Sequence, residues 1–259
     1  MKRYKLLLMD LDGILWRGNE FLDKNIIATK KLLLKDYRVV FMTNNATRSR
    51  KEYYERIAKT GINVDISDIY TSAYLLALYI VENGIKPVFV IGESGLYQEL
   101  ISNNIPVLSD AERVGYVAVG LDRYLTYNKL ARALKYLMNG ALFLATNTDP
   151  VYPVGNNLEP GAGAIVNFLS TALGRGPDFI AGKPNTWIID VITSKYNVSY
   201  DEILIIGDSI YTDLQLGLKK GIDTLLVLTG ITNKEDLNKI ADKPTYIVND
   251  LSEALDTIL

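Results

Sequence analysis

Short, continuous apolar runs recur along the chain, and amphipathic segments separate them. The runs are Leu6–Met9, Val39–Met42, Pro87–Ile91, Tyr116–Val119, Ala141–Ala145, Ile203–Ile206 and Thr224–Leu228. Such runs are typical of parallel strands that are buried on both faces. Apolar residues recur at helical spacing in residues 26–34, 49–60 and 128–138, which lie between the runs. The alternation predicts an α/β fold built on a parallel sheet.

Two segments interrupt this alternation. Residues 13–23 contain the turn-forming sequence Arg17-Gly18-Asn19 and predict a small hairpin beside the first strand. Residues 146–163 are rich in proline and glycine and show no periodicity, so we expect a shaped loop there. Asp149 and the turn at residues 160–163 either contact a substrate or belong to an ordinary surface loop.

Two aspartates follow the first apolar run directly. Side chains alternate along an extended chain, so Asp10 and Asp12 should emerge on the same side of the strand end. Their backbones would be about 6–7 Å apart at that spacing. A hard cation bound between the two carboxylates would relieve their repulsion. Taken alone, the pair could equally be solvated turn residues.

Polar residues also follow other predicted strands. Thr43, Asn44 and Asn45 follow the second run, and Asp208 follows the run Ile203–Ile206. Ligands bind beyond the carboxyl ends of the strands in open parallel sheets, so these side chains are candidates for one site.

Two further charged residues belong to the same group of candidates. Asp213 lies five residues after Asp208, a spacing that fits a loop entering a helix. Lys183 lies in the short motif Gly182-Lys183-Pro184. Each also has a plainer interpretation, since Asp213 could be a first-turn acid and Lys183 an exposed loop residue.

The amino-acid composition limits which catalytic and metal-binding groups the chain can use. The chain of 259 residues has no histidine and no cysteine, which excludes histidine bases, thiolate nucleophiles and cysteine metal sites. Four converging aspartates and a phosphate would be untenable without a divalent cation and a lysine. We therefore predict a phosphoryl-transfer site that holds Mg²⁺, with Lys183 offsetting the remaining charge.

The charge balance and the length of the apolar runs bear on partners and location. The formal net charge is −2, so we expect neither nucleic acid nor a membrane surface as a partner. No apolar run reaches the roughly 18 residues that a membrane span requires. We predict a cytoplasmic protein.

The motifs together resemble those of the haloacid dehalogenase superfamily. The matching stretches are DLDG at residues 10–13, the strand end at Thr43, GKP around Lys183, and GDSIYTD at residues 207–213. TNN at residues 43–45 and the TNTDPVYP segment are similar to the NagD-like, p-nitrophenyl phosphatase branch. The resemblance implies a phosphatase that hydrolyses small phosphorylated metabolites.

The resemblance also implies roles in catalysis. Asp10 would attack phosphorus and become an aspartyl phosphate. Asp12 would protonate the leaving group and then activate the hydrolytic water. Lys183 would orient Asp10 and offset the charge of the phosphate.

Binding roles follow in the same way. Thr43, Asn44 and Asn45 would hold phosphate oxygens. Asp208 would ligate Mg²⁺ together with Asp10 and the Asp12 carbonyl group, and Asp213 would support this set of ligands.

More than half of the chain separates Thr43 from Lys183, which is more than a Rossmann-like core needs. We therefore predict a catalytic core of residues 1–73 and 182–259 with an inserted α/β domain of residues 74–181. In the family, such an insert is a cap that determines specificity. Exposed strands of the cap could pair in a homodimer.

Two other functions use similar residues. A phosphoacceptor module of the receiver type also combines aspartates, a hydroxyl group and a lysine around Mg²⁺. A phosphotransferase or mutase would share the aspartyl phosphate but pass the group to a different acceptor. The physiological substrate is not specified by these motifs.

Overall fold

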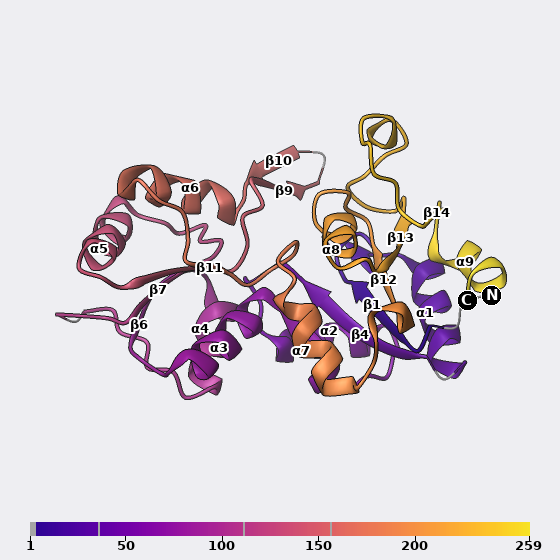
Figure 1. Cartoon of the computed structure of the whole chain (residues 1–259), viewed down its shortest axis with the longest axis horizontal. Coiled ribbons are helices and arrows are strands. Elements are labelled where there is room, and N and C mark those ends of the chain that lie inside the picture. The colour runs from indigo at the N-terminus through magenta and orange to yellow at the C-terminus, as the bar shows by residue number, and fades with distance from the viewer. Residues whose placement is uncertain (1–3, 36, 111, 156) are drawn as a thin grey trace. The chain divides into compact units, whose positions relative to one another are not determined.

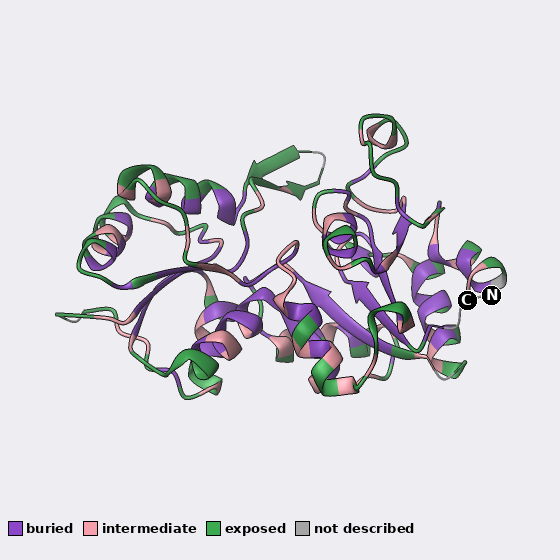
Figure 2. Ribbon diagram, in the orientation of Figure 1, coloured by how far each residue is buried: buried purple, intermediate pink, exposed green. Residues whose placement is uncertain are grey.

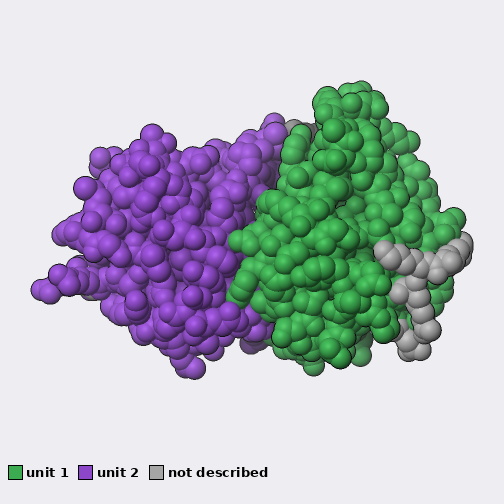
Figure 3. Space-filling view, in the orientation of Figure 1, with its two compact units in different colours: residues 1–43, 54–69, 183–259 green, residues 44–53, 70–182 purple. Residues whose placement is uncertain are grey.

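The computed structural model describes residues 4–35, 37–110, 112–155 and 157–259. The chain divides into two compact units (Figure 3). The first contains residues 1–43, 54–69 and 183–259, and the second contains residues 44–53 and 70–182. Among the described residues, no helix combines the length and apolarity needed to span a membrane.

A six-stranded sheet forms the centre of the first unit (Figure 1). In chain order its strands are β1 (Leu6–Asp10), β4 (Arg38–Thr43), β5 (Ile69–Thr71), β12 (Ile203–Gly207), β13 (Asp223–Val227) and β14 (Tyr246–Val248). Their spatial order is β14-β13-β12-β1-β4-β5, and the pairs from β14 to β4 are parallel. The predicted α/β class with a parallel sheet is confirmed.

The register of this sheet aligns the ends of three strands. Asp10 of β1 pairs with Met42 of β4, and Met9 pairs with Ile206 of β12. The strands β1 and β12 are buried along their whole length, as their unbroken apolar runs predict (Figure 2). The polar residues that follow Met9, Met42 and Ile206 therefore emerge at one edge of the sheet.

Helices and a hairpin complete the first unit. The helices are α1 (Asp23–Leu34), α7 (Trp187–Tyr196), α8 (Asp213–Lys220), α9 (Ala254–Thr257) and the short 3-10 turns Ile66–Asp68, Tyr200–Glu202, Asp236–Asn238 and Leu251–Glu253. The helix α2 (Arg50–Lys59) belongs to the first unit from Tyr54 onward. The hairpin predicted within residues 13–23 is present as β2 (Trp16–Arg17) and β3 (Glu20–Phe21). Gly18 adopts a φ of 53° in its turn, a conformation that favours glycine.

The second unit contains its own parallel sheet. Its strands are β6 (Val88–Ile91), β7 (Tyr116–Val119), β8 (Leu142–Ala145) and β11 (Phe179–Ile180), in the spatial order β11-β8-β7-β6. Its helices are α3 (Ser72–Asn83), α4 (Ser94–Ser102), α5 (Tyr127–Met138) and α6 (Ala162–Leu173). Apolar residues of α5 and α6 pack with β6, β7 and β8 in one core.

The segment 146–163 is more regular than expected. It contains an antiparallel hairpin of β9 (Val151–Val154) and β10 (Asn157–Pro160), and α6 begins at Ala162. Residue 156 of this segment lies outside the described residues. The strands are mostly exposed, so no apolar alternation marks them, and prolines within them obscured their extended conformation.

Replacing Phe143 should destabilise the second unit. Phe143 is fully buried at the centre of β8, so Phe143→Ala should lower the free energy of unfolding by about 3–5 kcal/mol. The control is Leu142→Ala, because Leu142 is the preceding residue of the strand and is 39% exposed. Urea denaturation measures both changes. Similar losses in the two variants would contradict the burial of Phe143 and the exposure of Leu142.

Candidate active site

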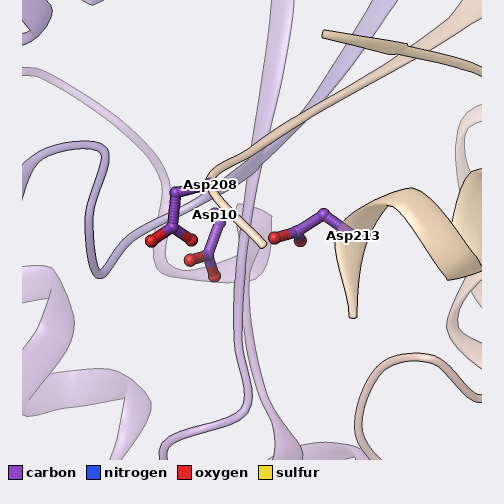
Figure 4. Close-up of side chains that lie close together, drawn as sticks. All are labelled: Asp10, Asp208 and Asp213. Carbon is purple, nitrogen blue, oxygen red and sulfur yellow. The ribbon is translucent and has the colours of Figure 1, made fainter. Parts of the chain in front are cut away.

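Three carboxylates meet at the aligned edge of the first sheet. Asp10 is the last residue of β1, Asp208 follows β12 and Asp213 is the first residue of α8. One carboxylate oxygen from each lies within 4.8 Å of the other two (Figure 4). All three residues are buried, with exposed fractions of 6%, 6% and 2%. Oxygen ligands in this arrangement could hold a hard divalent cation.

A buried lysine lies between two of these acids. Lys183 Nζ donates to Asp10 Oδ1 at 2.6 Å and to Asp213 Oδ1 at 2.7 Å. Lys183 is only 4% exposed, so its interpretation as a surface loop residue is wrong. It follows β11 and comes from a part of the sequence distant from both acids, as the predicted convergence requires.

Three glycines allow the backbone to approach these side chains closely. A Cβ atom added at Gly207 would lie 2.1 Å from Asp213 Cγ. Added at Gly13 or Gly230, it would lie 2.2 Å or 1.7 Å from Asp208 Oδ2. Real Cβ atoms do not tolerate such distances, so larger residues at these positions would displace the carboxylates.

Burial and mutual repulsion raise the pKa values of two of the acids. The pKa of Asp10 is well above its ordinary value because of burial and the nearby carboxylates, although Lys183 opposes the shift. The pKa of Asp208 rises to about 7, first because of burial and then because of Asp213. The pKa of Lys183 is also raised, because the attraction of Asp10 and Asp213 outweighs the effect of its burial. The protein alone therefore leaves negative charge at this site incompletely neutralised.

Asp12 lies outside the three-carboxylate cluster and has its own partners. Its Oδ2 atom accepts a hydrogen bond from Thr43 Oγ1 at 3.3 Å, and its Oδ1 atom accepts one from Trp16 Nε1 at 3.0 Å. The predicted neighbours Asp12 and Thr43 are thus brought together. Trp16 is fully buried, and its indole N–H nevertheless has a polar partner in Asp12. Only the polar N–H group of the indole could have indicated this contact from the sequence.

The loop after β13 also contributes, although its residues were not among the predicted site residues. The main-chain N–H of Ile231 donates to Asp208 Oδ2 at 2.7 Å. The hydroxyl group of Thr229 donates to the carbonyl oxygen of Gly13 at 2.6 Å. The position of Thr229-Gly230 after a buried strand was the available signal.

Asn44 and Asn45 belong to the second unit, where both side chains have hydrogen bonds. Asn44 Nδ2 donates to Asp149 Oδ2 at 3.0 Å, and the Asn44 carbonyl oxygen accepts a hydrogen bond from Asn147 Nδ2 at 2.7 Å. Asn45 Oδ1 accepts hydrogen bonds from the main-chain N–H and the hydroxyl group of Thr47. Their contact with phosphate stays a prediction.

The chain matches two family models. Residues 7–106 match a model described as haloacid dehalogenase-like hydrolase, and residues 180–254 match one described as HAD-hydrolase-like. Together the two models include the segments that carry Asp10, Thr43, Lys183, Asp208 and Asp213.

Curated relatives and a solved structure extend the comparison to the whole chain. An acid sugar phosphatase from Staphylococcus saprophyticus is 36% identical over 256 residues, which cover 98% of each chain. The 5'-nucleotidase YutF from Bacillus subtilis is 33% identical over 254 residues, again 98% of each. The structure of a p-nitrophenyl phosphatase from Archaeoglobus fulgidus has a TM-score of 0.94 at 29% identity and covers 99% of this chain and 100% of its own.

Removing the buried lysine should destabilise the first unit strongly. Lys183→Met would leave Asp10 and Asp213 without their cation and should lower the free energy of unfolding by about 3–5 kcal/mol. The control is Lys220→Met, because the pair of Lys220 and Asp190 is more exposed and should contribute below about 1 kcal/mol. Denaturant unfolding at neutral pH in a metal chelator measures both.

A second variant separates charge from packing. Adding Asp213→Asn to Lys183→Met removes one unpaired carboxylate and should restore part of the lost stability. If the double variant were less stable than Lys183→Met alone, electrostatic repulsion would not be the cause of the loss.

Proposed function

This chain belongs to the haloacid dehalogenase-like hydrolases and is a phosphatase, and from that premise we propose that it uses Mg²⁺ and a phosphorylated Asp10. The match to a p-nitrophenyl phosphatase structure over nearly the whole chain agrees with the branch predicted from the sequence. The observation that carries the proposal is the buried cluster of Asp10, Asp208 and Asp213 with Lys183 between two of its members.

The donor set fits a divalent cation. Its members are carboxylate oxygens, which Mg²⁺ prefers. The pKa values of Asp10 and Asp208 are raised first by burial and then by the neighbouring carboxylates, and a bound cation would offset both effects. Asp10, Asp208 and the carbonyl oxygen of Asp12 would hold the ion, and Asp213 would support it. When bound, Mg²⁺ would neutralise charge on the transferring phosphoryl group.

Phosphoryl transfer to Asp10 would be the first step. A carboxylate oxygen of Asp10 attacks phosphorus, and the bond between phosphorus and the leaving oxygen breaks. Asp12 gives its proton to that oxygen, so the product leaves as an alcohol. Lys183, held by Asp10 Oδ1, keeps the nucleophile oriented and balances charge during transfer.

Hydrolysis of the aspartyl phosphate would be the second step. Asp12, now ionised, takes a proton from a water molecule, and the water oxygen attacks phosphorus. The bond from phosphorus to Asp10 breaks, which releases inorganic phosphate and restores both carboxyl groups to their initial states. The hydrogen bonds of Asp12 come from Trp16 and Thr43 and not from the groups of the three-carboxylate cluster. This separation supports the role of Asp12 as the proton carrier.

Different parts of the chain would recognise the phosphate and the leaving group of the substrate. Thr43, Asn44 and Asn45 would bind phosphate oxygens. The inserted domain predicted at residues 74–181 would act as the cap that selects the leaving group. The names of the two relatives suggest sugar phosphates and nucleoside monophosphates as substrates, and a location in the cytoplasm fits such metabolites.

Asp10→Asn should abolish phosphate release. An amide cannot attack phosphorus as a carboxylate does, so activity toward p-nitrophenyl phosphate should fall by a factor of roughly 10³ or more. Activity of the wild type should also depend on Mg²⁺. The matched control is Asp190→Asn, since Asp190 is an exposed acid of α7. Unchanged turnover in Asp10→Asn would remove the proposed mechanism.

Mg²⁺ should stabilise the protein through the same acids. A cation that binds only the folded state at a hundredfold excess over its dissociation constant adds about 2.7 kcal/mol to the free energy of unfolding. Asp208→Asn should lose most of this gain, whereas Asp190→Asn should keep it. Thermal unfolding with and without Mg²⁺ measures the effect, and an equal gain in both variants would place the cation elsewhere.

A further inference from the structure

Trp16 has two hydrogen bonds to the turn that contains Asp12. Its indole Nε1 donates to Asp12 Oδ1 at 3.0 Å, and its carbonyl oxygen accepts a hydrogen bond from the N–H of Gly13 at 2.7 Å. Trp16 has no exposed surface, so water does not compete for its N–H group. The indole therefore makes a well-defined contact with one particular oxygen of Asp12.

Neighbouring side chains hold the indole in this orientation. The guanidinium carbon of Arg56 lies 4.0 Å from the centre of the Trp16 ring, within the range of a cation–π interaction. Phe21 of β3 contacts the same ring edge to face, with centroids 6.3 Å apart and planes at 74°. Arg56 also donates to the carbonyl oxygen of Gly18 in the hairpin turn. Rotation of the indole away from Asp12 would disrupt both ring contacts.

The contact fixes the orientation of the Asp12 carboxyl group. The indole N–H can only donate, and it engages Oδ1. The other oxygen, Oδ2, lies 3.3 Å from Thr43 Oγ1, so the two contacts together leave the carboxyl group little freedom to rotate.

We propose that Trp16 is a positioning residue for the general acid: its indole N–H fixes the orientation of the Asp12 carboxyl group relative to the substrate. This inference rests on the proposed role of Asp12 in the phosphatase reaction. The pair of Arg56 and Phe21 keeps the indole in place. Trp16 itself exchanges no proton with the substrate.

The dependence of the rate on the leaving group tests this role. p-Nitrophenolate is a weak base and leaves without protonation, whereas phenolate and p-methoxyphenolate are stronger bases that gain from a general acid. A defect in positioning the proton should therefore grow with the basicity of the leaving group. A defect in folding or phosphate binding should affect all three aryl phosphates equally.

The kinetic experiment compares Trp16→Phe with Trp187→Phe. The chain has two tryptophans, so Trp187 in α7 provides a matched control. In Trp16→Phe, kcat/KM for phenyl phosphate and p-methoxyphenyl phosphate should fall by about tenfold or more, and that for p-nitrophenyl phosphate by less than about threefold. Trp187→Phe should behave as the wild type. Equal losses for all three substrates in Trp16→Phe would overturn the inference.

Two further measurements keep the test decisive if Trp16→Phe folds poorly. Arg56→Met removes the cation above the indole and should shift the leaving-group dependence in the same direction by a smaller amount. In a ¹H–¹⁵N spectrum, Asp12→Ala should move the indole N–H signal of Trp16 and leave that of Trp187 in place. An unmoved Trp16 signal would show that the contact is absent in solution and would overturn the inference.

The outcomes also separate this inference from the proposed function. If Asp10→Asn retains activity, the aspartyl phosphate mechanism fails whatever Trp16 does. If Asp10→Asn is inactive and Trp16→Phe shows the wild-type dependence on the leaving group, the mechanism stands and the role of Trp16 is rejected.

Discussion

The hydrogen bonds from Lys183 to Asp10 and Asp213 are the interaction on which the active-site region depends. Each carboxylate at this position is buried, and burial of a carboxylate without a counter-charge is strongly unfavourable. One ammonium group cannot balance three ionised carboxylates. This imbalance is the physical reason to expect a divalent cation at the site.

Sheet register brings these groups together. The pairings of Met9 with Ile206 and of Asp10 with Met42 set the ends of β1, β12 and β4 level with one another. A shift of one residue in either pairing would move the polar residues that follow these strands out of line with one another, so the register of the buried strands positions the site. The stability of the hydrophobic sheet therefore maintains an electrostatically unfavourable edge. Gly13, Gly207 and Gly230 complete this edge by leaving room for carboxylates where other residues would place a Cβ atom.

The architecture and much of the candidate site could be predicted from the sequence, because both depend on where the buried strands end. Continuous apolar runs identify buried parallel strands, and the polar residues after them identify the functional edge, so Asp10, Thr43 and Asp208 could be grouped before the structure was known. Exposed extended segments carry no such pattern, and the hairpin at residues 151–160 was therefore expected only as a loop. The contacts of Trp16 and Ile231 depend on tertiary geometry, since an indole or a main-chain N–H is present in many positions without a polar partner.

In the proposed mechanism, two aspartates that are two residues apart have different chemical tasks. Asp10 lies among carboxylates and is held by a lysine, which suits a nucleophile that must remain fixed beside a cation. Asp12 is partly exposed and accepts hydrogen bonds from an indole and a hydroxyl group, neither of which carries charge. The proposed proton carrier and the proposed nucleophile therefore differ in their hydrogen-bond partners, although both residues come from the same strand end.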